Sequence, residues 1–466
     1  MSYKKPGAYV ERIHSVSLVS NLPSTSVVGF VGDTIRGVAN KPVKVTSWSQ
    51  FEQKFAKGIA NPFEYGGVAD AVYGFFTNGG TELYIVRTVE AGSKKATATI
   101  PESGVKFEAK EEGTWGNDIT VTVKQDSKAK NSTFTVVVNY QGTKVEELKG
   151  LNSNNFAEVI NETSDFIQVA EENKNALANG TGDLTGGTLV KTTLGTYKEG
   201  LECFESVRDI NILAIPNVNE TGVQEALVDY CAVKGNIFPI VDVPANLEIE
   251  EVMDYKDRFG SFLGAMYYPR VQIVDPVTSK TRVVSPTGYL AGLYAYTDTT
   301  RGVHKSPAGV EASLKGVIGV EKELPDVEIG NLNNYNINCI IPKSGRGIVV
   351  WGARMLQPSG DRQFVSDIRL DIYVEESIKR LTEWAVFEPI DEQLFNRMEG
   401  QLCEFFNGLM DEGSIKGTKP EEAYFVVCDE TINDNPNSST LEIEVGYAKK
   451  KPAEFIVTRI SQMREV

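Results

Sequence analysis

Between residues 191 and 340, short apolar runs alternate with stretches that have helical spacing. The runs INILAIPN and NIFPIVDVP are predicted to be buried strands, and VQEALVDYCAVKG between them is predicted to be a helix. Strand–helix alternation at this spacing predicts a parallel or mixed sheet with helices on its faces. Residues 21–90 show the same pattern, so we expect them to join residues 191–340 in one discontinuous α/β domain.

Residues 91–190 interrupt this pattern with a different composition. They are rich in Thr, Val, Lys, Asn and Gly, and stretches such as DITVTVKQ and TFTVVVNYQG alternate apolar with polar residues. A period of two predicts antiparallel strands with one face in water. We therefore expect a β-rich outer domain inserted into the α/β domain. We also expect the glycine-rich stretch NGTGDLTGG at its end to act as a hinge.

The last part of the chain combines helices and strands. A long amphipathic stretch at residues 391–411 predicts a helix, and EEAYFVVCDE and STLEIEVGYA predict strands. We expect residues 341–446 to form an α+β domain. The predicted fold class is therefore multidomain, α/β and α+β. It has a mixed-sheet core domain, a β-rich insertion and an α+β C-terminal domain with an extended arm at each end of the chain.

The two predicted arms are residues 1–20 and residues 447–466. The run EFIVTRI in the second arm has the pattern of a β-strand. A last strand that the rest of its domain does not enclose is an exposed edge, and an exposed edge invites pairing with another chain. Its seven residues would span about 23 Å, so this strand is predicted to pair with a neighbouring molecule.

The net charge of −16 disfavours nucleic acid and anionic membranes as partners, because both bind basic surfaces. The charge is uneven: residues 1–14 carry +2 and residues 447–466 carry +3, which leaves −21 on the residues between them. Basic ends on an acidic body suit attraction to another copy of the same protein, although terminal lysines can equally serve only to keep the ends soluble.

No stretch approaches the roughly 20 apolar residues of a membrane span. The opening MSYKKPGAYVERIH has basic residues but lacks the apolar core of a secretory signal. We therefore expect no membrane insertion, and we expect the protein to be made and kept in a cytoplasm unless another machine exports it.

Little in the sequence supplies catalytic chemistry. The chain has two histidines, His14 and His304, far apart in the sequence, and it has no P-loop, GxSxG or HExxH motif. Asp242 and Asp275 follow predicted strands, where α/β sheets often carry active sites, but aspartates beside prolines also cap turns. The sequence predicts no catalytic residue, no metal site and no cofactor. An α/β enzyme with a polar pocket near Asp242 or Asp275 stays an alternative.

The cysteines also argue for packing rather than redox or metal chemistry. They are scattered, odd in number and without a CxxC pair, which predicts reduced and mostly buried thiols. The five cysteines are Cys203, Cys231, Cys339, Cys403 and Cys428.

A second alternative is a monomeric binding module that uses the insertion to engage carbohydrate or a surface. Clustered aromatic side chains would support that function, but the spacing of those in the insertion suggests a core. They are Phe107, Trp115, Phe134, Tyr140, Phe156 and Phe166.

Several motifs, taken in order, resemble those of one known family. The N-terminal KKPGAYVERI and, most strongly, RGIVVWGARML with the following VEESIKRLTEWAVFEPIDEQLF are similar to passages of contractile tail sheath proteins. That family comprises sheaths of bacteriophages of the myovirus type and of related phage-tail-like bacteriocins. The ending KPAEFIVTRI completes the match, while Ala8 and Arg12 depart from the family's N-terminal pattern.

The resemblance implies a structural, non-enzymatic subunit. Such subunits stack as hexameric rings in a helical tube around an inner tail tube, and they contract to drive that tube through a bacterial envelope without consuming a nucleotide. The implied partners are further copies of the chain, the inner tube protein, and baseplate and tail terminator proteins. The implied location is a virion tail, or alternatively a headless bacteriocin particle or another contractile injection system. Assembly in a host bacterial cytoplasm is implied by the resemblance alone.

The resemblance also implies roles for particular residues. The arms are expected to add strands to sheets of neighbouring copies, anchored by apolar side chains of both arms: Tyr9, Val10, Ile13, Phe455, Ile456 and Val457. Gly446 and Pro452 are the expected hinge of the C-terminal arm. The 341–446 domain is expected to face the inner tube through Arg397 and Glu399, although the helix that carries them can equally be a core helix.

Overall fold

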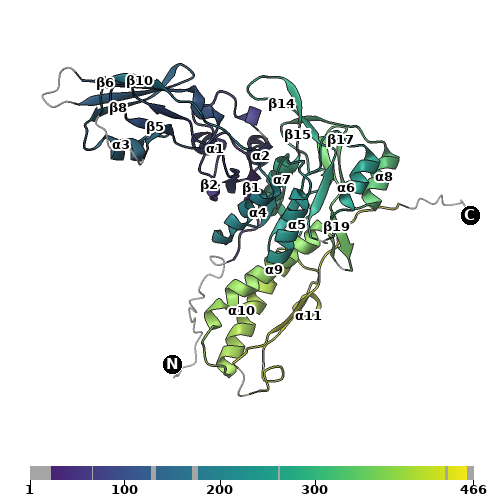
Figure 1. Cartoon of the computed structure of the whole chain (residues 1–466). Helices are drawn as coiled ribbons and strands as arrows, with labels where there is room; N and C mark the ends of the chain where they lie inside the picture. The colour runs from purple at the N-terminus through teal and green to yellow at the C-terminus, as the bar shows by residue number, and fades with distance from the viewer. Residues whose placement is uncertain are drawn as a thin grey trace, which may run out of the picture. The chain divides into compact units, whose positions relative to one another are not determined.

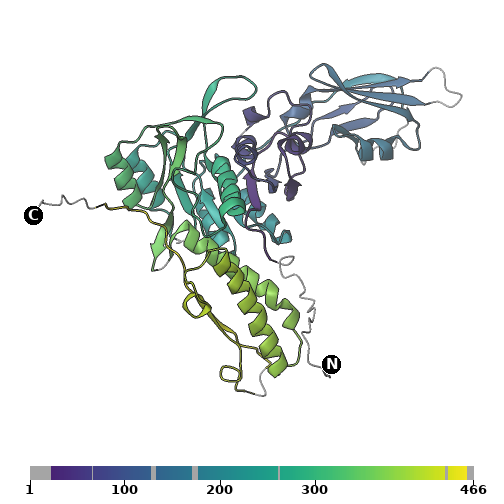
Figure 2. The ribbon, with the colours of Figure 1, turned by 180° about the vertical axis from the view of Figure 1, so that it is seen from behind.

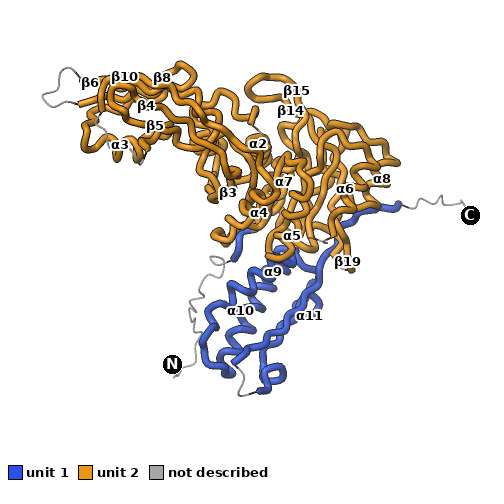
Figure 3. The backbone as a smooth tube through the Cα atoms, viewed as in Figure 1, with its two compact units in different colours: residues 1–24, 370–466 blue, residues 25–369 orange. Residues whose placement is uncertain are grey.

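The computed structural model describes residues 22–65, 67–126, 133–170, 177–260, 263–360, 362–435 and 439–458. The chain forms two compact units, which Figure 3 shows in different colours. One unit comprises residues 25–369, and the other comprises residues 1–24 together with residues 370–466.

The larger unit is built on an eight-stranded mixed sheet (Figure 1). Neighbouring strands run parallel except at the two ends of the sheet, where the outermost pairs are antiparallel. In spatial order the strands are β18 (Gly347–Trp351), β17 (Asn338–Lys343), β13 (Ala265–Tyr268), β12 (Phe238–Val241), β11 (Ile212–Ala214), β1 (Val28–Gly32), β3 (Leu83–Arg87) and β2 (Val43–Val45). The mixed sheet predicted from strand–helix alternation is thus confirmed.

Helices cover both faces of this sheet. Phe30 of β1 packs edge-on against Phe75 of α2, with ring centroids 6.3 Å apart, whereas its neighbour Val31 faces Gly200 of α4. Successive strand residues point to opposite faces, so α2 and α4 lie on opposite faces. Outside residues 91–190, the described helices that lie wholly within this unit are α1 (Trp48–Phe55), α2 (Gly67–Thr77), α4 (Leu194–Glu202), α5 (Val223–Lys234), α6 (Ile249–Lys256), α7 (Thr287–Arg301) and α8 (Asp326–Asn334).

Helix α7 packs closely along α2. A Cβ atom at Gly288 would lie 2.1 Å from the backbone oxygen of Ala71, so only glycine allows this approach. Beside the large sheet lie an antiparallel three-stranded sheet and a hairpin. Their strands are β15 (Thr281–Val284), β14 (Val271–Val274) and β16 (Val317–Val320) in the sheet, and β19 (Arg354–Ser359) and β20 (Arg362–Phe364) in the hairpin.

The predicted β-rich insertion is present between β3 and α4, as the view from behind also shows (Figure 2). It contains two antiparallel sheets and one helix around a core that includes Trp115. Its elements are β4 (Thr97–Thr99), β5 (Lys106–Ala109), β6 (Ile119–Gln125), β7 (Phe134–Tyr140), β8 (Thr143–Leu151), α3 (Phe156–Thr163), β9 (Ile167–Val169) and β10 (Gly180–Asp183).

The hinge predicted in NGTGDLTGG is wrong. Gly180–Asp183 is strand β10, paired with β6, and Thr185 and Thr188 continue the pairing with Thr97 and Lys94. The glycines there serve close packing: a Cβ atom at Gly187 would lie 2.4 Å from the backbone oxygen of Gly113. The end of the insertion is therefore a bonded edge and not a free linker.

The smaller unit contains two long helices, a short helix and a two-stranded sheet. These are α9 (Val365–Thr382), which begins within the larger unit, α10 (Glu392–Asp411), α11 (Pro420–Ala423), β21 (Tyr424–Val427) and β22 (Glu444–Tyr447). The domain boundary expected at residue 341 falls inside β17, and the compact unit begins at Leu370. Short 3-10 helices cover Pro62–Tyr65, Thr114–Asp118, Cys203–Ser206 and Glu383–Ala385.

Candidate assembly interface

The sheet of the smaller unit is the candidate site of strand addition. Strands β21 and β22 pair antiparallel, with Tyr424 opposite Tyr447 and Val427 opposite Glu444. Within the described residues no third strand is bonded to either of them. An isolated two-stranded ribbon is marginally stable in water, so this sheet depends on what packs against it.

Helix α10 supplies that packing. The Phe406 ring stacks on Tyr424 with centroids 5.2 Å apart and contacts Tyr447 at 5.8 Å. The Tyr424 hydroxyl donates to Oδ1 of Asn407 at 2.8 Å. The helix starts where the sequence indicates, because the Asp391 side chain caps it by accepting from the N–H of Leu394 at 2.8 Å.

One edge of the eight-stranded sheet is already covered by another segment of the chain. The outer edge of β18 is covered by residues 309–314, which exchange backbone hydrogen bonds of 2.9–3.0 Å with Ile348 and Val350. Edges covered in this way do not accept another chain. Among the described residues, the β21–β22 sheet has no such covering strand.

The chain leaves β22 through a clamp that the sequence did not reveal. One carboxylate oxygen of Asp371, on α9, accepts a hydrogen bond from the Tyr447 hydroxyl. The other oxygen accepts one from Nζ of Lys449 at a distance of 2.7 Å. Nζ of Lys450 donates to the backbone oxygen of Gly413 at 2.7 Å. Two of the three lysines before Pro452 are thereby held against the domain.

The predicted hinge residues differ in their surroundings. Gly446 lies inside β22 opposite Phe425, where a Cβ atom would approach the ring to 2.2 Å. Pro452 follows the clamped lysines in a stretch without helix or strand. A hinge at Pro452 stays a prediction, and Gly446 is part of the sheet.

Beyond the clamped lysines, residues 452–458 of the C-terminal arm are mostly exposed and pair with no strand of the described chain. Phe455, Ile456 and Val457 are 72%, 86% and 80% exposed. Residues 452–458 have no helix or strand assignment within the described range. The remaining predicted anchors, Tyr9, Val10 and Ile13, lie outside the described residues, as does His14.

Arg397 and Glu399 on α10 have different environments. The Arg397 guanidinium lies 3.7 Å from the ring centroid of Trp384, and the Trp384 indole N–H donates to Oε1 of Gln401 at 2.7 Å. Glu399 is half-buried. Burial of the Cys403 and Cys428 thiols raises their pKa, and the nearby carboxylate of Glu399 raises it further. Arg397 is therefore the more exposed of the two.

The apolar stripe of α10 is buried as its spacing predicts. Its members are Leu394, Phe395, Met398, Leu402, Phe405 and Phe406, to which the structure adds Leu409.

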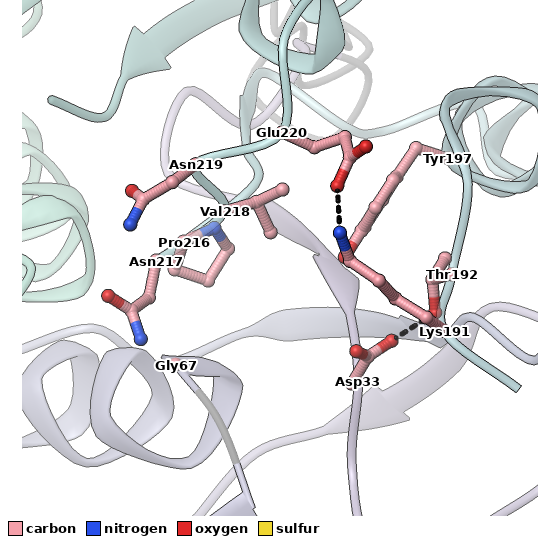
Figure 4. Close-up of a pocket in the computed structure, with 10 residues that line it drawn as sticks. All are labelled: Asp33, Gly67, Lys191, Thr192, Tyr197, Pro216, Asn217, Val218, Asn219 and Glu220. Atoms are coloured by element: carbon pink, nitrogen blue, oxygen red, sulfur yellow. Dashed lines mark hydrogen bonds and ion pairs between the residues drawn. The ribbon is translucent and has the colours of Figure 1, made fainter. Parts of the chain in front are cut away.

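A polar pocket of about 310 Å³ lies at the carboxyl end of β1 in the larger unit (Figure 4). Strand β1 pairs with β3 on one side and β11 on the other, which makes this a point where the strand order reverses. Oδ1 of Asp33 accepts from the hydroxyls of Thr88 and Thr192 at 2.8 Å, and Lys191 pairs with Glu220 at 2.7 Å.

Four titratable side chains line the pocket: Asp33, Lys191, Tyr197 and Glu220. Burial raises the pKa of the Tyr197 hydroxyl, so this phenol keeps its proton at neutral pH. The sequence candidates Asp242 and Asp275 do not line it.

Asp242 and Asp275 instead hold turns and ion pairs. Asp242 is 2% exposed and accepts from the backbone N–H of Val243 at 2.9 Å. Asp275 accepts from the N–H groups of Val277 and Thr278 at 2.9 and 2.8 Å, and from Nε of Arg282 at 2.8 Å. The turn-capping role expected beside proline is thus confirmed for Asp275, whereas Asp242 pairs with Arg270.

The aromatic residues of the insertion form its core. All six are less than 8% exposed: Phe107, Trp115, Phe134, Tyr140, Phe156 and Phe166. They offer no aromatic platform for carbohydrate.

The cysteines are free, and three of the five are buried. Burial raises the pKa of Cys339 to about 12, as expected of an inert core thiol. Over the described ranges, no group of three or more His, Cys, Asp or Glu side chains could hold a metal ion. In the same ranges, no helix is long and apolar enough to span a bilayer.

Comparison with known proteins finds similarity to one family over part of the chain. Residues 191–355 match the family of the phage tail sheath protein central domain. A putative prophage major tail sheath protein of Pseudomonas aeruginosa (strain UCBPP-PA14) is 28% identical over 210 residues. That alignment covers 44% of this chain and 53% of the relative, so the chain spans about half the length of this curated protein.

Two solved structures share the fold over nearly the whole chain. The sheath tail protein of Desulfitobacterium hafniense has a TM-score of 0.69 at 14% identity, covering 95% of this chain and all of its own. The sheath complex of an extracellular contractile injection system, in its contracted state, has a TM-score of 0.61 at 20% identity, covering 99% and 98%. At these identities the two structures establish a sheath-like fold, and the sequence match identifies residues 191–355 as similar to the central domain of phage tail sheath proteins.

Proposed function

We propose that this protein is the structural subunit of a contractile tail sheath. In this proposal it polymerises as stacked hexameric rings around an inner tube, and it contracts to drive that tube through a bacterial envelope. Two features of the same chain support the proposal. The chain presents a two-stranded sheet with no third strand among the described residues, and an exposed apolar segment after it.

The donor half is suited to reach a neighbour. The side chains of Phe455, Ile456 and Val457 are almost wholly in water in the single chain, which is unfavourable for three consecutive apolar residues. Adding this segment to β21 or β22 of another copy would satisfy its backbone groups and cover these side chains. The N-terminal anchors Tyr9, Val10 and Ile13 are proposed to act in the same way.

Strand exchange links subunits while their compact units stay free to rotate. A chain segment shared between two copies holds them together, and a hinge allows a change of angle. The clamp at Asp371 favours a hinge after Lys450, close to Pro452, since the residues before it are bonded to the domain. Contraction would then release free energy stored in the extended lattice, with no catalytic site involved.

The contact with the inner tube is proposed to use the outer face of α10. Arg397 is exposed on that helix and positioned by Trp384, whereas Glu399 is half-buried. Reversing the charge of Arg397 should weaken docking of the tube. Docking that is unchanged in Arg397→Glu and Glu399→Lys would exclude this face.

The other proposed partners are baseplate and tail terminator proteins. The particle is proposed to be a phage tail. A headless phage-tail-like bacteriocin or another contractile injection system is the alternative, because all of them use the same kind of sheath. The similarity to the sheath complex of a contractile injection system does not favour one of these three kinds of particle over the others.

The testing experiment is negative-stain electron microscopy of the purified full chain beside a chain that ends at Lys451. Hollow tubes from the full chain and none from the truncated chain are expected. Ile456→Pro, which removes a backbone donor from the exchanged strand, should also abolish tubes, and the matched control Ile456→Val should not.

Two other outcomes would change the proposal. Tubes from the truncated chain would keep the sheath assignment but exclude strand exchange through this arm. Dispersed particles from the full chain at every salt and protein concentration, and also in the presence of an inner tube, would contradict polymerisation of this chain.

A further inference from the structure

We propose that Phe387, at the tip of the loop between α9 and α10, inserts into a pocket at the C-terminal end of α7 in a second copy of this chain. The inference rests on the proposed function, because it requires that copies of the chain associate. It identifies a contact between globular surfaces, separate from the exchange of the terminal arms.

The loop presents an apolar tip that nothing in the described chain covers. Phe387 is 102% exposed, and its neighbours Val386 and Ile390 are 63% and 40% exposed. Phe387 also has a φ of +71°, a conformation that side chains larger than glycine rarely adopt. A strained backbone together with a wholly exposed aromatic ring is typical of a binding site. Burying the ring against a partner would offset the cost of the strained backbone.

The base of the loop is held in place. Backbone hydrogen bonds join Val386 to Glu383 at 3.3 Å and Glu388 to Ala385 at 3.0 Å. On the following side, the carboxylate of Asp391 caps α10. These hydrogen bonds hold the backbone on both sides of Phe387 in a defined conformation, so its side chain is kept at the tip of the loop.

The rim of the loop is acidic. Residues 383–392 contain four carboxylates, at Glu383, Glu388, Asp391 and Glu392, and no basic side chain. A complementary surface should therefore combine an apolar recess with positive charge.

Such a recess lies at the end of α7 in the larger unit. It has a volume of about 310 Å³, enough for one aromatic side chain. Its apolar walls come from Tyr296, Pro307, Ala308 and Ala312. Tyr296 is itself 43% exposed.

The recess also has the required charge. Arg301 and Lys305 line it, and Nζ of Lys315 lies 5.1 Å from the Tyr296 ring centroid. The acid in its wall, Glu311, is already paired with Arg301 at 2.6 Å. Lys305 donates only to two backbone oxygens, each at 3.3 Å, so its charge is not neutralised there.

The pocket of similar volume at the end of β1 fits the loop less well. Two of its walls carry carboxylates, Asp33 and Glu220, against a single ammonium group on Lys191. These carboxylates would repel the acidic rim of the loop. Charge therefore selects the α7 recess.

A tip on one copy that enters a recess elsewhere on the next copy is a heterologous contact. Contacts of this kind build rings or open helical arrays rather than closed dimers. The contact thus has the symmetry that a stacked-ring or helical assembly needs.

The first test replaces Phe387 with photoreactive p-benzoylphenylalanine in the full chain. Unlabelled and ¹⁵N-labelled chains are mixed at high concentration, irradiated and analysed by mass spectrometry. Cross-links between the two labels that map to residues 296–312 are expected. The proposal would be overturned if the cross-links map to other residues, if they form only within one chain, or if none form. This holds whether or not tubes form.

The second test uses variants in the tube assay. Phe387→Ala and Thr300→Trp, which fills the recess, should each raise the concentration needed for assembly at least tenfold. Their controls are Val233→Ala, at another exposed apolar residue, and Thr299→Trp, beside the recess on the same helix. Unchanged melting curves would show that all four variants fold.

The two proposals can fail separately. If Phe387→Ala and Thr300→Trp assemble like the parent chain while truncation at Lys451 abolishes tubes, this contact is wrong and strand exchange stands. If the cross-links form but truncation has no effect, strand exchange is wrong and the contact stands.

Discussion

Arg36 shows how a single side chain can fix the inserted domain to its parent. Its guanidinium lies 4.1 Å from the ring centroid of Trp115 and 4.5 Å from that of Phe166, both in the insertion. It also donates to the backbone oxygen of Lys57 at 2.7 Å and pairs with Glu111 at 3.4 Å. Only 4% of this side chain is exposed, so the insertion is held by a buried charge and not by a flexible linker.

Replacing Arg36 with an uncharged residue should lower the free energy of unfolding. Arg36→Met leaves the carboxylate of Glu111 and two carbonyl oxygens without their donor, and loss of one partner of a buried pair costs about 3–5 kcal/mol of unfolding free energy. Urea denaturation measures this loss. The control Lys191→Met removes a pair whose side chains are 83% and 38% exposed, and it should cost less than about 1 kcal/mol. Equal losses would contradict the assigned role of Arg36.

Asp275 should make stability depend on pH. Burial alone would raise the pKa of its carboxyl, but hydrogen bonds from Thr278 and Val277 and the charge of Arg282 outweigh burial and lower it. Because the folded pKa lies below the unfolded one, the folded state holds fewer protons. The ionised carboxylate therefore stabilises the protein above the usual Asp pKa, and this stability is lost as the pH falls through the folded value.

Comparing the wild type with Asp275→Asn tests whether stability falls with pH in this direction. The difference in unfolding free energy should be largest at neutral pH and should shrink below about pH 4. Denaturant titrations at several pH values measure it. A difference that stays constant down to about pH 3 would show that the carboxylate is not the titrating group.

At the scale of elements, the two-stranded sheet of the smaller unit depends on α9 as well as α10. Asp371 of α9 binds both Tyr447 and Lys449 through its two carboxylate oxygens. This clamp sets where the ordered sheet ends and the arm begins. The sequence separation between these partners explains why no local pattern revealed it.

Asp371→Ala should free the end of β22. Hydrogen bonds to a charged group are worth about 1.5–3 kcal/mol each, so amide exchange of residues 444–449 should accelerate at least tenfold while α10 keeps its protection. Hydrogen–deuterium exchange with mass spectrometry measures this. Asp411→Ala, at an exposed aspartate at the end of α10, is the control. Unchanged exchange in Asp371→Ala would place the start of the arm elsewhere.

At the scale of the whole molecule, charge is divided between basic ends and an acidic body. Residues 1–14 carry +2 and residues 447–466 carry +3 in a chain of net −16. If arms of one copy bind the body of another, this division steers their encounter. Mobile ions screen such attraction over about 10 Å at 0.1 M salt and about 3 Å at 1 M.

Assembly should therefore slow as salt increases. We expect the rate of tube growth, followed by light scattering, to fall several-fold between about 0.05 and 0.5 M NaCl. The double charge reversal Lys4→Glu and Lys5→Glu should slow growth at low salt and reduce the salt dependence. Growth that accelerates with salt would show that burial of apolar surface, rather than charge, controls the encounter.

Local sequence patterns were enough to predict the kinds of helices and strands in this protein. Strand–helix alternation predicted the mixed sheet, the period of two predicted the antiparallel insertion, and helical spacing predicted the buried stripe of α10. These patterns could be recognised because periodicity is a local property, imposed on neighbouring residues by the face that an element buries. The exposed apolar segment at Phe455 was visible for the same reason.

The contacts between distant segments became apparent from the folded structure. It placed β17 and β18 in the large sheet rather than in a C-terminal domain, and it enclosed Gly446 within β22. It joined Asp371 to Lys449 and Arg36 to Glu111, pairs 78 and 75 residues apart. No local pattern encodes such partners, because burial and hydrogen bonding over the whole chain select them together.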